Sequence, residues 1–159
     1  MRAALSLVWA APERRDSGPP AGGGVNRSGN GNPVPSTILV IEDEILIRLA
    51  VCDYLRGCGY RVIEGSTGEE AQRVFQAGEP IEILFSDIDL GSGMDGFVLA
   101  AWVRANYPTV RILLTSGIAK LAEDAAHLCD GPLLAKPYSH TSLEDRIKRL
   151  LGLFGRNTG

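Results

Sequence analysis

The stretch that decides the fold is Ile38-Leu39-Val40-Ile41, which runs directly into Glu42-Asp43. A run of four apolar residues, three of them β-branched, is typical of a strand that is buried on both faces of a sheet. Two carboxylates follow at once, so this strand would carry charged side chains to one edge of the sheet. The sequence thus predicts a buried strand that ends in an acidic pair.

A helical pattern extends from residue 43 to residue 56, directly after this strand, and Gly57 and Gly59 end it. Its apolar residues recur at the spacing of an amphipathic helix, which predicts one buried side. The residues expected on that side are Ile45, Leu49, Cys52 and Leu55.

Short apolar runs and helical patterns alternate in the same way along the rest of the chain. Further strands are expected at residues 61–64, 81–86, 110–115 and 132–135. Further helices are expected between Thr67 and Gly78, over 96–106 and 118–128, and from Ser142 onward. Five strands that each precede a helix predict an α/β fold. The expected architecture is a flavodoxin-like, doubly wound sheet of five parallel strands in the order 2-1-3-4-5, with helices on both faces.

Glycine and proline separate an N-terminal segment from this domain. Residues 1–36 contain 6 Gly and 5 Pro, whereas the rest of the chain contains 13 Gly and 4 Pro. A segment so rich in these residues cannot bury enough apolar surface to offset the entropy of ordering it. The expected organisation is therefore a disordered extension over 1–36, a folded domain over 37–153 and a short tail over 154–159.

The charge and cysteine content exclude several classes of protein. With 16 basic and 19 acidic residues the net charge is −3, so the chain lacks the basic surface that binding to nucleic acid or to an acidic membrane needs. It also lacks the run of about 18 apolar residues that a membrane-spanning helix requires. Its three cysteines are expected to be reduced thiols in a cytoplasmic protein rather than a disulfide framework.

Polar side chains follow the expected strands at the points where the strands end. They are Glu42 and Asp43 after the first strand, Asp87 and Asp89 after the third, Thr115 and Ser116 after the fourth, and Lys136-Pro137 after the fifth. Sheets of this kind bind ligands beyond the carboxyl ends of their strands, so we expect these side chains to form one site. Carboxylates placed so close repel one another unless a cation lies among them. Such oxygen ligands suit Mg²⁺, which keeps several waters and shares a phosphate oxygen.

The combination of residues predicts phosphoryl chemistry at this site. A carboxylate held by a cation and by Lys136 can act as a nucleophile on phosphorus and form an aspartyl phosphate. The cation and the ammonium group would stabilise the charge on the phosphoryl oxygens. A hydroxyl such as that of Thr115 can then bond to a phosphoryl oxygen, so phosphorylation would switch the conformation.

At this point the sequence resembles a known family, the receiver domain of bacterial two-component response regulators. The resemblance covers about residues 36–152. The matching motifs are Ile-Leu-Val-Ile-Glu42-Asp43-Glu44, Phe-Ser-Asp87-Ile-Asp-Leu followed by Met94-Asp95-Gly96, Leu-Leu-Thr115-Ser-Gly, and Leu-Ala-Lys136-Pro137-Tyr.

The resemblance assigns a role to each of these positions. It implies that Asp87 is the phosphoacceptor, that Asp43 is a direct Mg²⁺ ligand and that Glu42 holds the metal through water. The backbone carbonyl of Asp89 would be the remaining protein ligand of the Mg²⁺. For the phosphate it implies that Thr115 is the switch hydroxyl, with Ser116 beside it, and that Lys136 binds the phosphate. It also implies a cis peptide bond before Pro137.

The resemblance also implies partners and a mode of action. A histidine kinase or a histidine phosphotransfer protein would donate the phosphoryl group, and the output would be altered binding of a downstream protein or formation of a homodimer. We expect a stand-alone receiver without an attached output domain, and a signalling protein rather than an enzyme.

Two positions depart from the usual pattern of the family. The loop after the phosphoacceptor usually contains a proline, whereas this chain has Gly91-Ser92-Gly93 and is one residue longer. The position three residues before the lysine is often aromatic and here is Leu133. We therefore expect a more mobile loop and a modified coupling to Thr115.

Two other classes of protein share part of the pattern. Asp87-Ile-Asp89 resembles the nucleophile motif of haloacid-dehalogenase-like phosphatases, which use Mg²⁺ and an aspartyl phosphate, but in that family the motif follows the first strand. A flavodoxin-like cofactor binder would need a phosphate-binding loop after the first strand, where this chain carries Glu42 and Asp43. The receiver is the favoured interpretation, with the phosphatase as the alternative.

Overall fold

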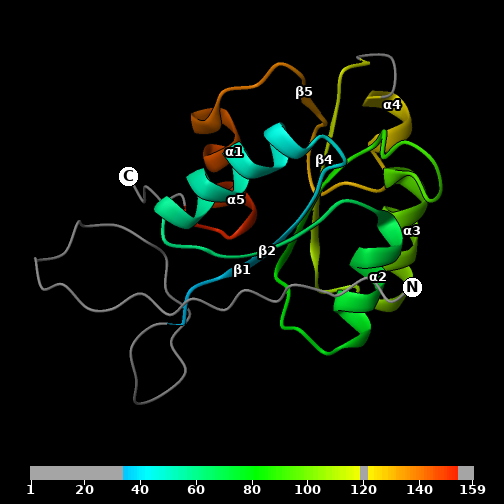
Figure 1. Ribbon diagram of the computed structural model, residues 1–159, viewed down its shortest axis with the longest axis horizontal. Coiled ribbons are helices and arrows are strands. Elements are labelled where there is room, and N and C mark those ends of the chain that lie inside the picture. The colour runs from blue at the N-terminus through cyan, green and yellow to red at the C-terminus, as the bar shows by residue number, and fades with distance from the viewer. Residues whose placement is uncertain (1–33, 119–121, 154–159) are drawn as a thin grey trace, which may run out of the picture.

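The computed structural model describes residues 34–118 and 122–153 (Figure 1). The expectations for residues 1–33 and for the tail at 154–159 lie outside the described residues. The described residues form a single parallel sheet with helices on both of its faces.

The sheet has five strands in the order β2-β1-β3-β4-β5, and all neighbouring pairs are parallel. The strands are β1 (Thr37–Ile41), β2 (Arg61–Gly65), β3 (Ile83–Asp87), β4 (Arg111–Ser116) and β5 (Leu134–Ala135). The helices are α1 (Ile45–Gly57), α2 (Gly68–Gln76), α3 (Gly96–Asn106), α4 (Ala122–Ala125) and α5 (His140–Leu150). The predicted architecture and strand order are therefore confirmed.

Strand β1 is buried along its whole length because helices cover both faces of the sheet. Ile38 and Val40 pack with residues of α1 and α5, whereas Leu39 and Ile41 pack with residues of α2, α3 and α4. The alternation of side chains along a strand therefore divides one apolar run between two separate cores. This explains why the run contains no polar residue.

The buried side of α1 differs from the predicted one. Cys52 and Leu55 are buried as expected, but Ile45 is 59% exposed and Leu49 is 45% exposed. The core contact is made instead by Val51 together with Cys52 and Leu55. The helical spacing alone allows either face of α1 to be buried. Packing against β1 and α5 buries the face that carries Val51, Cys52 and Leu55.

Side chains cap α2 and α3 at the starts predicted for these two helices. Thr67 accepts a hydrogen bond from Glu70 N–H at 3.2 Å, and Asp95 accepts one from Val98 N–H at 2.8 Å. The Glu70 carboxylate in turn accepts the N–H of Ser66 at 2.6 Å. A loop residue therefore caps each helix directly before its first residue.

The C-terminal third of the domain departs most from the predicted boundaries. Of the helix expected over 118–128, residues 119–121 lie outside the described residues, and α4 covers Ala122–Ala125, so it ends three residues before the predicted end. Strand β5 contains only two of the four residues expected. Helix α5 starts at His140, two residues before the predicted Ser142. The reason is that Ser139 caps the helix by accepting the N–H of Ser142 at 3.0 Å, so Ser142 lies inside the first turn.

Gly96 begins α3 directly beneath the end of β3. A side-chain carbon at this position would overlap the backbone carbonyl of Asp87, and the Gly96 N–H donates to the Ile88 carbonyl at 2.8 Å. The absence of a side chain therefore allows α3 to start against the strand that carries Asp87.

We predict that Gly96→Ala lowers the free energy of unfolding by about 2 kcal/mol, because backbone must move to admit the methyl group. Gly57→Ala is the matched control, since no atom beyond its chain neighbours and the backbone of its own helix lies within 4 Å of the added carbon. The control should change stability by less than about 1 kcal/mol, and in the stabilising direction. Urea unfolding followed by circular dichroism measures both, and equal effects of the two variants would contradict the packing described here.

Candidate functional site

Three carboxylates meet at the carboxyl edge of the sheet. Glu42 and Asp43 follow β1, and Asp87 is the last residue of the neighbouring strand β3. Each offers an oxygen atom that lies within 4.8 Å of the oxygens offered by the other two. Glu42 and Asp87 are buried, whereas Asp43 is exposed, so the cluster opens to solvent on the side of Asp43.

Lys136 joins the two buried carboxylates. Its Nζ lies 2.5 Å from Asp87 Oδ2 and 3.1 Å from Glu42 Oε2. Burial alone would lower the pKa of Lys136, but the hydrogen bonds to Asp87 and Glu42 outweigh this effect and raise it. The lysine is therefore a permanent cation that offsets part of the repulsion between the two carboxylates.

Glu42 is the carboxylate most affected by its surroundings. Burial raises its pKa to about 7, although hydrogen bonds from Glu44 N–H and Lys136 act in the opposite direction. The Glu44 N–H lies 3.1 Å from Glu42 Oε1. At neutral pH the group is thus close to the midpoint of its titration, and a cation at the site would favour its ionised form.

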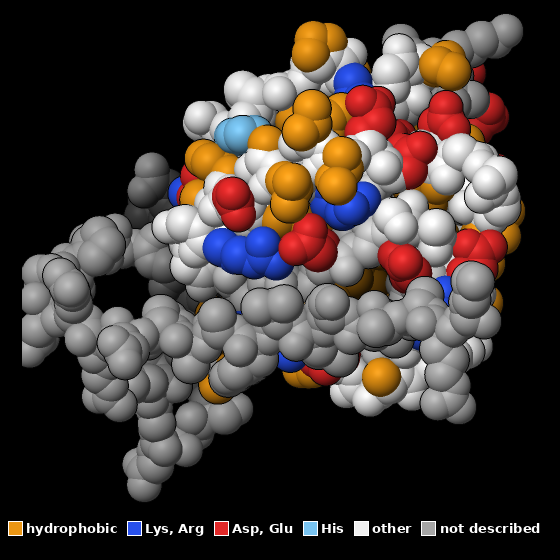
Figure 2. Space-filling model, viewed as in Figure 1, with side chains coloured by type: hydrophobic (Ala, Val, Ile, Leu, Met, Phe, Trp, Pro, Cys, Tyr) orange, Lys and Arg blue, Asp and Glu red, His pale blue; other side chains and the backbone are white. Residues whose placement is uncertain are grey.

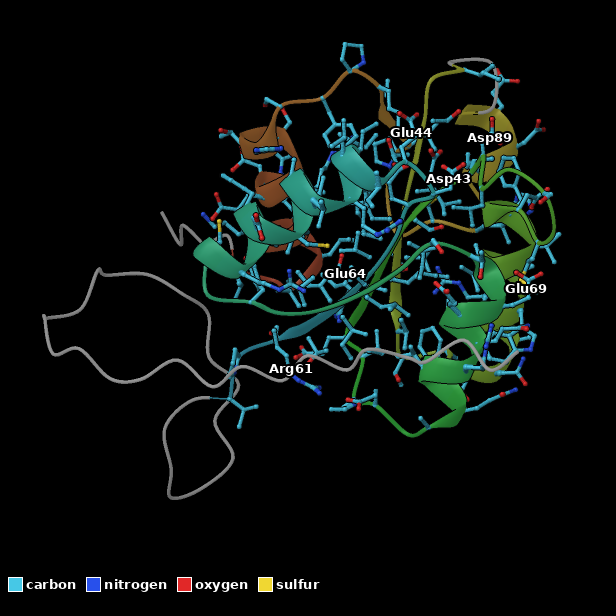
Figure 3. The ribbon with its side chains drawn as sticks, in the orientation of Figure 1. Asp43, Glu44, Arg61, Glu64, Glu69 and Asp89 are labelled. Carbon is cyan, nitrogen blue, oxygen red and sulfur yellow. The ribbon has the colours of Figure 1, made fainter. Side chains whose placement is uncertain are left out.

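Both oxygens of Asp87 have hydrogen-bond partners. Oδ2 accepts from Lys136, and Oδ1 accepts from the backbone N–H of Asp89 at 3.1 Å. The Asp89 side chain is exposed, and its Oδ1 accepts from Gly91 N–H at 3.2 Å. Figure 3 shows Asp43 and Asp89 on neighbouring segments at the same end of the sheet. The side chain of Asp89 thus holds the following loop, while its backbone N–H orients Asp87.

Arg48 supports the turn that carries the acidic pair, a role that no sequence motif indicated. Its Nη1 donates to the backbone carbonyl of Glu42 at 2.7 Å, and its Nε lies 3.6 Å from Glu64 Oε2 on β2. The helical spacing places Arg48 one turn after Glu44, but only the fold shows that its side chain reaches back to the strand end.

The two hydroxyl residues at the end of β4 are engaged with the backbone. Thr115 is Asp87's register partner on the neighbouring strand, and its Oγ1 donates to the Leu134 carbonyl at 2.7 Å. Ser116 Oγ accepts from Ile118 N–H at 3.0 Å. The structure thus places Thr115 beside the acidic site but directs its hydroxyl toward β5.

The residues that flank Lys136 complete this edge of the domain. The peptide bond between Lys136 and Pro137 is cis. Leu133 is half-buried and packs against the core formed with α2, α3 and α4. Leu133 occupies the position that is often aromatic in receiver domains, and its aliphatic side chain contacts the core.

A groove of about 530 Å³ adjoins the site on the side of α1. It is lined by apolar side chains of α1, including Leu46 and Ala50, and by Lys136, Pro137 and Tyr138 beyond β5. Leu46 is 77% exposed, and the exposed Ile45 and Leu49 lie on the same helix. Figure 2 shows these hydrophobic side chains gathered over α1. Lys136 thus belongs both to the acidic site and to the apolar groove.

The geometry of this edge matches a known family. The model of the response regulator receiver domain matches residues 38–148. The chain therefore belongs to the response regulator receiver domain family of two-component signalling. The haloacid-dehalogenase alternative gains no support, because its motif follows β3 rather than the first strand and the family match covers the whole site.

Relatives with named functions are similar over the same region. The chain is 30% identical over 119 residues to the sensor kinase CckA of Brucella abortus, which is 73% of this chain and 12% of that protein. It is 28% identical over 120 residues to a probable chemotaxis protein CheY of Rhizobium etli, which is 72% of this chain and 92% of that protein. The chain thus spans about an eighth of the kinase but nearly all of the chemotaxis protein.

Solved receiver structures share the fold. The response regulator TrrA of Thermotoga maritima, in complex with Mg²⁺ and BeF, is 26% identical with a TM-score of 0.67, covering 72% of this chain and 98% of that one. The receiver domain of the hybrid histidine kinase CckA is 30% identical with a TM-score of 0.62, covering 73% and 99%. In the described part of this chain, no helix has the length and apolar character needed to cross a membrane.

We predict that ionisation of Glu42 destabilises the protein without metal. Its pKa in the folded state lies above that of an ordinary glutamate, so the folded state binds the proton more tightly than the unfolded chain. Stability should therefore fall as the pH rises from about 4.5 to about 7 and then level off.

Glu42→Gln should remove this fall, which we expect to be on the order of 2 kcal/mol. Urea unfolding of both proteins in EDTA between pH 4.5 and 8 measures it, and the difference between the two curves isolates Glu42. Parallel curves for the two proteins would contradict the raised pKa.

Proposed function

We propose that the protein is a response regulator that is phosphorylated on Asp87 by a phosphohistidine donor, with Mg²⁺ as cofactor. The observation that carries this proposal is the pairing of one lysine with two buried carboxylates next to an exposed third carboxylate. Asp43 and Asp87 would hold the metal directly, Glu42 through water and Asp89 through its backbone carbonyl. Mg²⁺, when bound, would offset the charge of the carboxylates and of the phosphoryl oxygens.

The transfer step uses the orientation of Asp87. One of its oxygens attacks the phosphorus of the donor, a P–O bond forms and the P–N bond to the donor imidazole breaks. The imidazole keeps the electron pair of that bond and takes up a proton. Lys136 moves its hydrogen bond from Asp87 to a phosphoryl oxygen, where its positive charge stabilises the transferred group. The protein thus acts as an acceptor in a signalling reaction rather than as a dedicated enzyme.

The signal would leave the site through Thr115. A phosphoryl group on Asp87 adds acceptor oxygens beside this hydroxyl, which at present donates to the Leu134 carbonyl. When Thr115 turns toward the phosphoryl group, the carbonyl of β5 loses its partner, and the edge of the sheet around β5 rearranges. We propose that altered binding of another protein at this edge is the output.

The donor would dock on the apolar groove beside α1. Lys136 lines both this groove and the acidic site, so a protein seated in the groove brings its own side chains next to Asp87. Exposed Leu46 offers a central apolar contact for such a partner. A histidine-bearing helix of a kinase or phosphotransfer protein has the chemistry that fits both features.

Phosphorylation of Asp87 can be tested with a small phosphodonor. Incubation with phosphoramidate and Mg²⁺ should label the wild type with one base-labile phosphate per chain, as measured by intact mass. Asp87→Asn should not be labelled because the amide is not a nucleophile, whereas Asp89→Asn should still be labelled. Equal labelling of wild type and Asp87→Asn would overturn the assignment.

The docking surface can be tested with a matched pair of variants. Leu46→Gln should slow phosphotransfer from a histidine kinase active on the wild type by about tenfold, because it removes a central apolar contact. Val98→Gln on α3 is the control, since Val98 is also exposed (53%) but lies away from the groove. Labelling by phosphoramidate should be equal in both variants. Equal slowing by both variants would exclude α1 as the specific docking surface.

A further inference from the structure

The two ends of the loop between β3 and α3 are held together by a backbone hydrogen bond. Gly96 N–H donates to the Ile88 carbonyl at 2.8 Å, so the loop leaves and re-enters the domain at neighbouring points. Leu90 is only 4% exposed and anchors the first limb in the core. The path of residues 91–94 is therefore the variable part of this loop.

Residues 91–94 have high backbone freedom. Gly91 and Gly93 have φ angles of 72° and 105°, in the region that favours glycine, and the three residues Gly91, Ser92 and Gly93 are exposed. Two glycines in so short a segment allow many alternative paths. Contacts with the rest of the domain must therefore select the path that is observed.

Helix α2 supplies such contacts at the end of this segment. Glu69 Oε1 accepts the backbone N–H of Met94 at 3.1 Å, and the Met94 side chain covers Gly68 so closely that a carbon added there would lie 2.9 Å from its sulfur. Glu69 also borders Gly93, where an added carbon would lie 3.2 Å from Glu69 Oε1. We call the contacts of Gly68 and Glu69 with Gly93 and Met94 the α2 clamp.

The same loop borders the acidic site at its other end. The Asp89 N–H donates to Asp87, and a carbon added at Gly91 would lie 3.4 Å from Asp43 Oδ2. Figure 3 shows Glu69 on the α2 side of the domain and Asp43 and Asp89 at the end of the sheet. The loop therefore connects the α2 clamp to the two carboxylates for which we propose a metal.

We propose that Glu69 is a positioning residue for the Mg²⁺ site: by accepting the Met94 N–H it holds the glycine-rich loop in the path that places the Asp89 backbone beside Asp87 and Gly91 beside Asp43. This inference rests on the proposed function, because it assumes that Mg²⁺ binds there. Glu69 itself does not touch the site. It acts through the loop, and the acceptor oxygen of its side chain, rather than its charge, is what the clamp requires.

The alternative explanation of Glu69 is a favourable charge in the first turn of α2, near the positive end of the helix. The two explanations differ in what a glutamine would do. Glu69→Gln keeps the acceptor oxygen and removes the charge, whereas Glu69→Ala removes both. A role through charge predicts equal effects of the two variants, and a role through the clamp predicts an effect of alanine alone.

The test measures Mg²⁺ affinity by titration calorimetry on the full chain. Glu69→Ala should weaken binding about fivefold, the effect expected from loss of one hydrogen bond that supports a ligand. Glu69→Gln should stay within about twofold of the wild type. Asp53→Ala on α1 is the control for loss of an exposed carboxylate from a helix and should leave the affinity unchanged. Unchanged binding in Glu69→Ala, or equal weakening in Glu69→Gln, would overturn the proposal.

A second measurement reports on the clamp without metal. In EDTA, hydrogen exchange of the Met94 amide should be faster in Glu69→Ala than in the wild type and in Glu69→Gln. If it is equally protected in all three, the clamp does not hold the loop. If the wild type binds no Mg²⁺, the proposed function fails and the positioning role fails with it. Binding by the wild type without an effect of Glu69→Ala refutes the positioning role alone.

Discussion

The contact of Lys136 with Asp87 and Glu42 is the interaction on which the site depends. Two carboxylates that are 5% and 1% exposed cannot both ionise in a folded protein without a nearby cation. One ammonium group does not fully balance two carboxylates, and burial, more than the charge of Asp87, keeps the pKa of Glu42 raised. The domain therefore carries a local deficit of positive charge, and a divalent cation at the exposed Asp43 would relieve it.

The fold creates this deficit because three parallel strands end at the same edge. Glu42, Asp87 and Lys136 come from segments far apart in the chain, and the parallel register of β1, β3, β4 and β5 brings their ends together. Gly96 and Arg48 then restrict how the chain leaves β3 and β1. Burial makes the ionised carboxylates unfavourable, and the strand ends place them close enough together for one bound cation to offset their charge.

The sequence predicted the sheet, its order and the residues at its carboxyl edge, because apolar strands and strand-end residues are local patterns. It did not predict which side of α1 is buried. Ile45, Leu49 and Cys52 fit one helical stripe, whereas Val51, Cys52 and Leu55 fit another, and only packing against a particular strand and helix decides between them. The support from Arg48 and the α2 clamp was also missed, since both depend on contacts between segments with no shared sequence pattern. The predicted start of α5 at Ser142 was wrong because Ser139 and Ser142 are both serines that can cap a helix, and the sequence alone does not distinguish them.

The two outer strands of the sheet have a further consequence for the behaviour of the protein in a crowded solution. An edge strand exposes unpaired backbone groups to any other extended chain. β5 contains only two residues, and β2 at the opposite edge carries Arg61 and Glu64, both in ion pairs with neighbouring segments. A short edge and a charged edge are two ways to prevent strands of separate molecules from joining. Both edges of the sheet therefore disfavour edge-to-edge pairing between separate molecules.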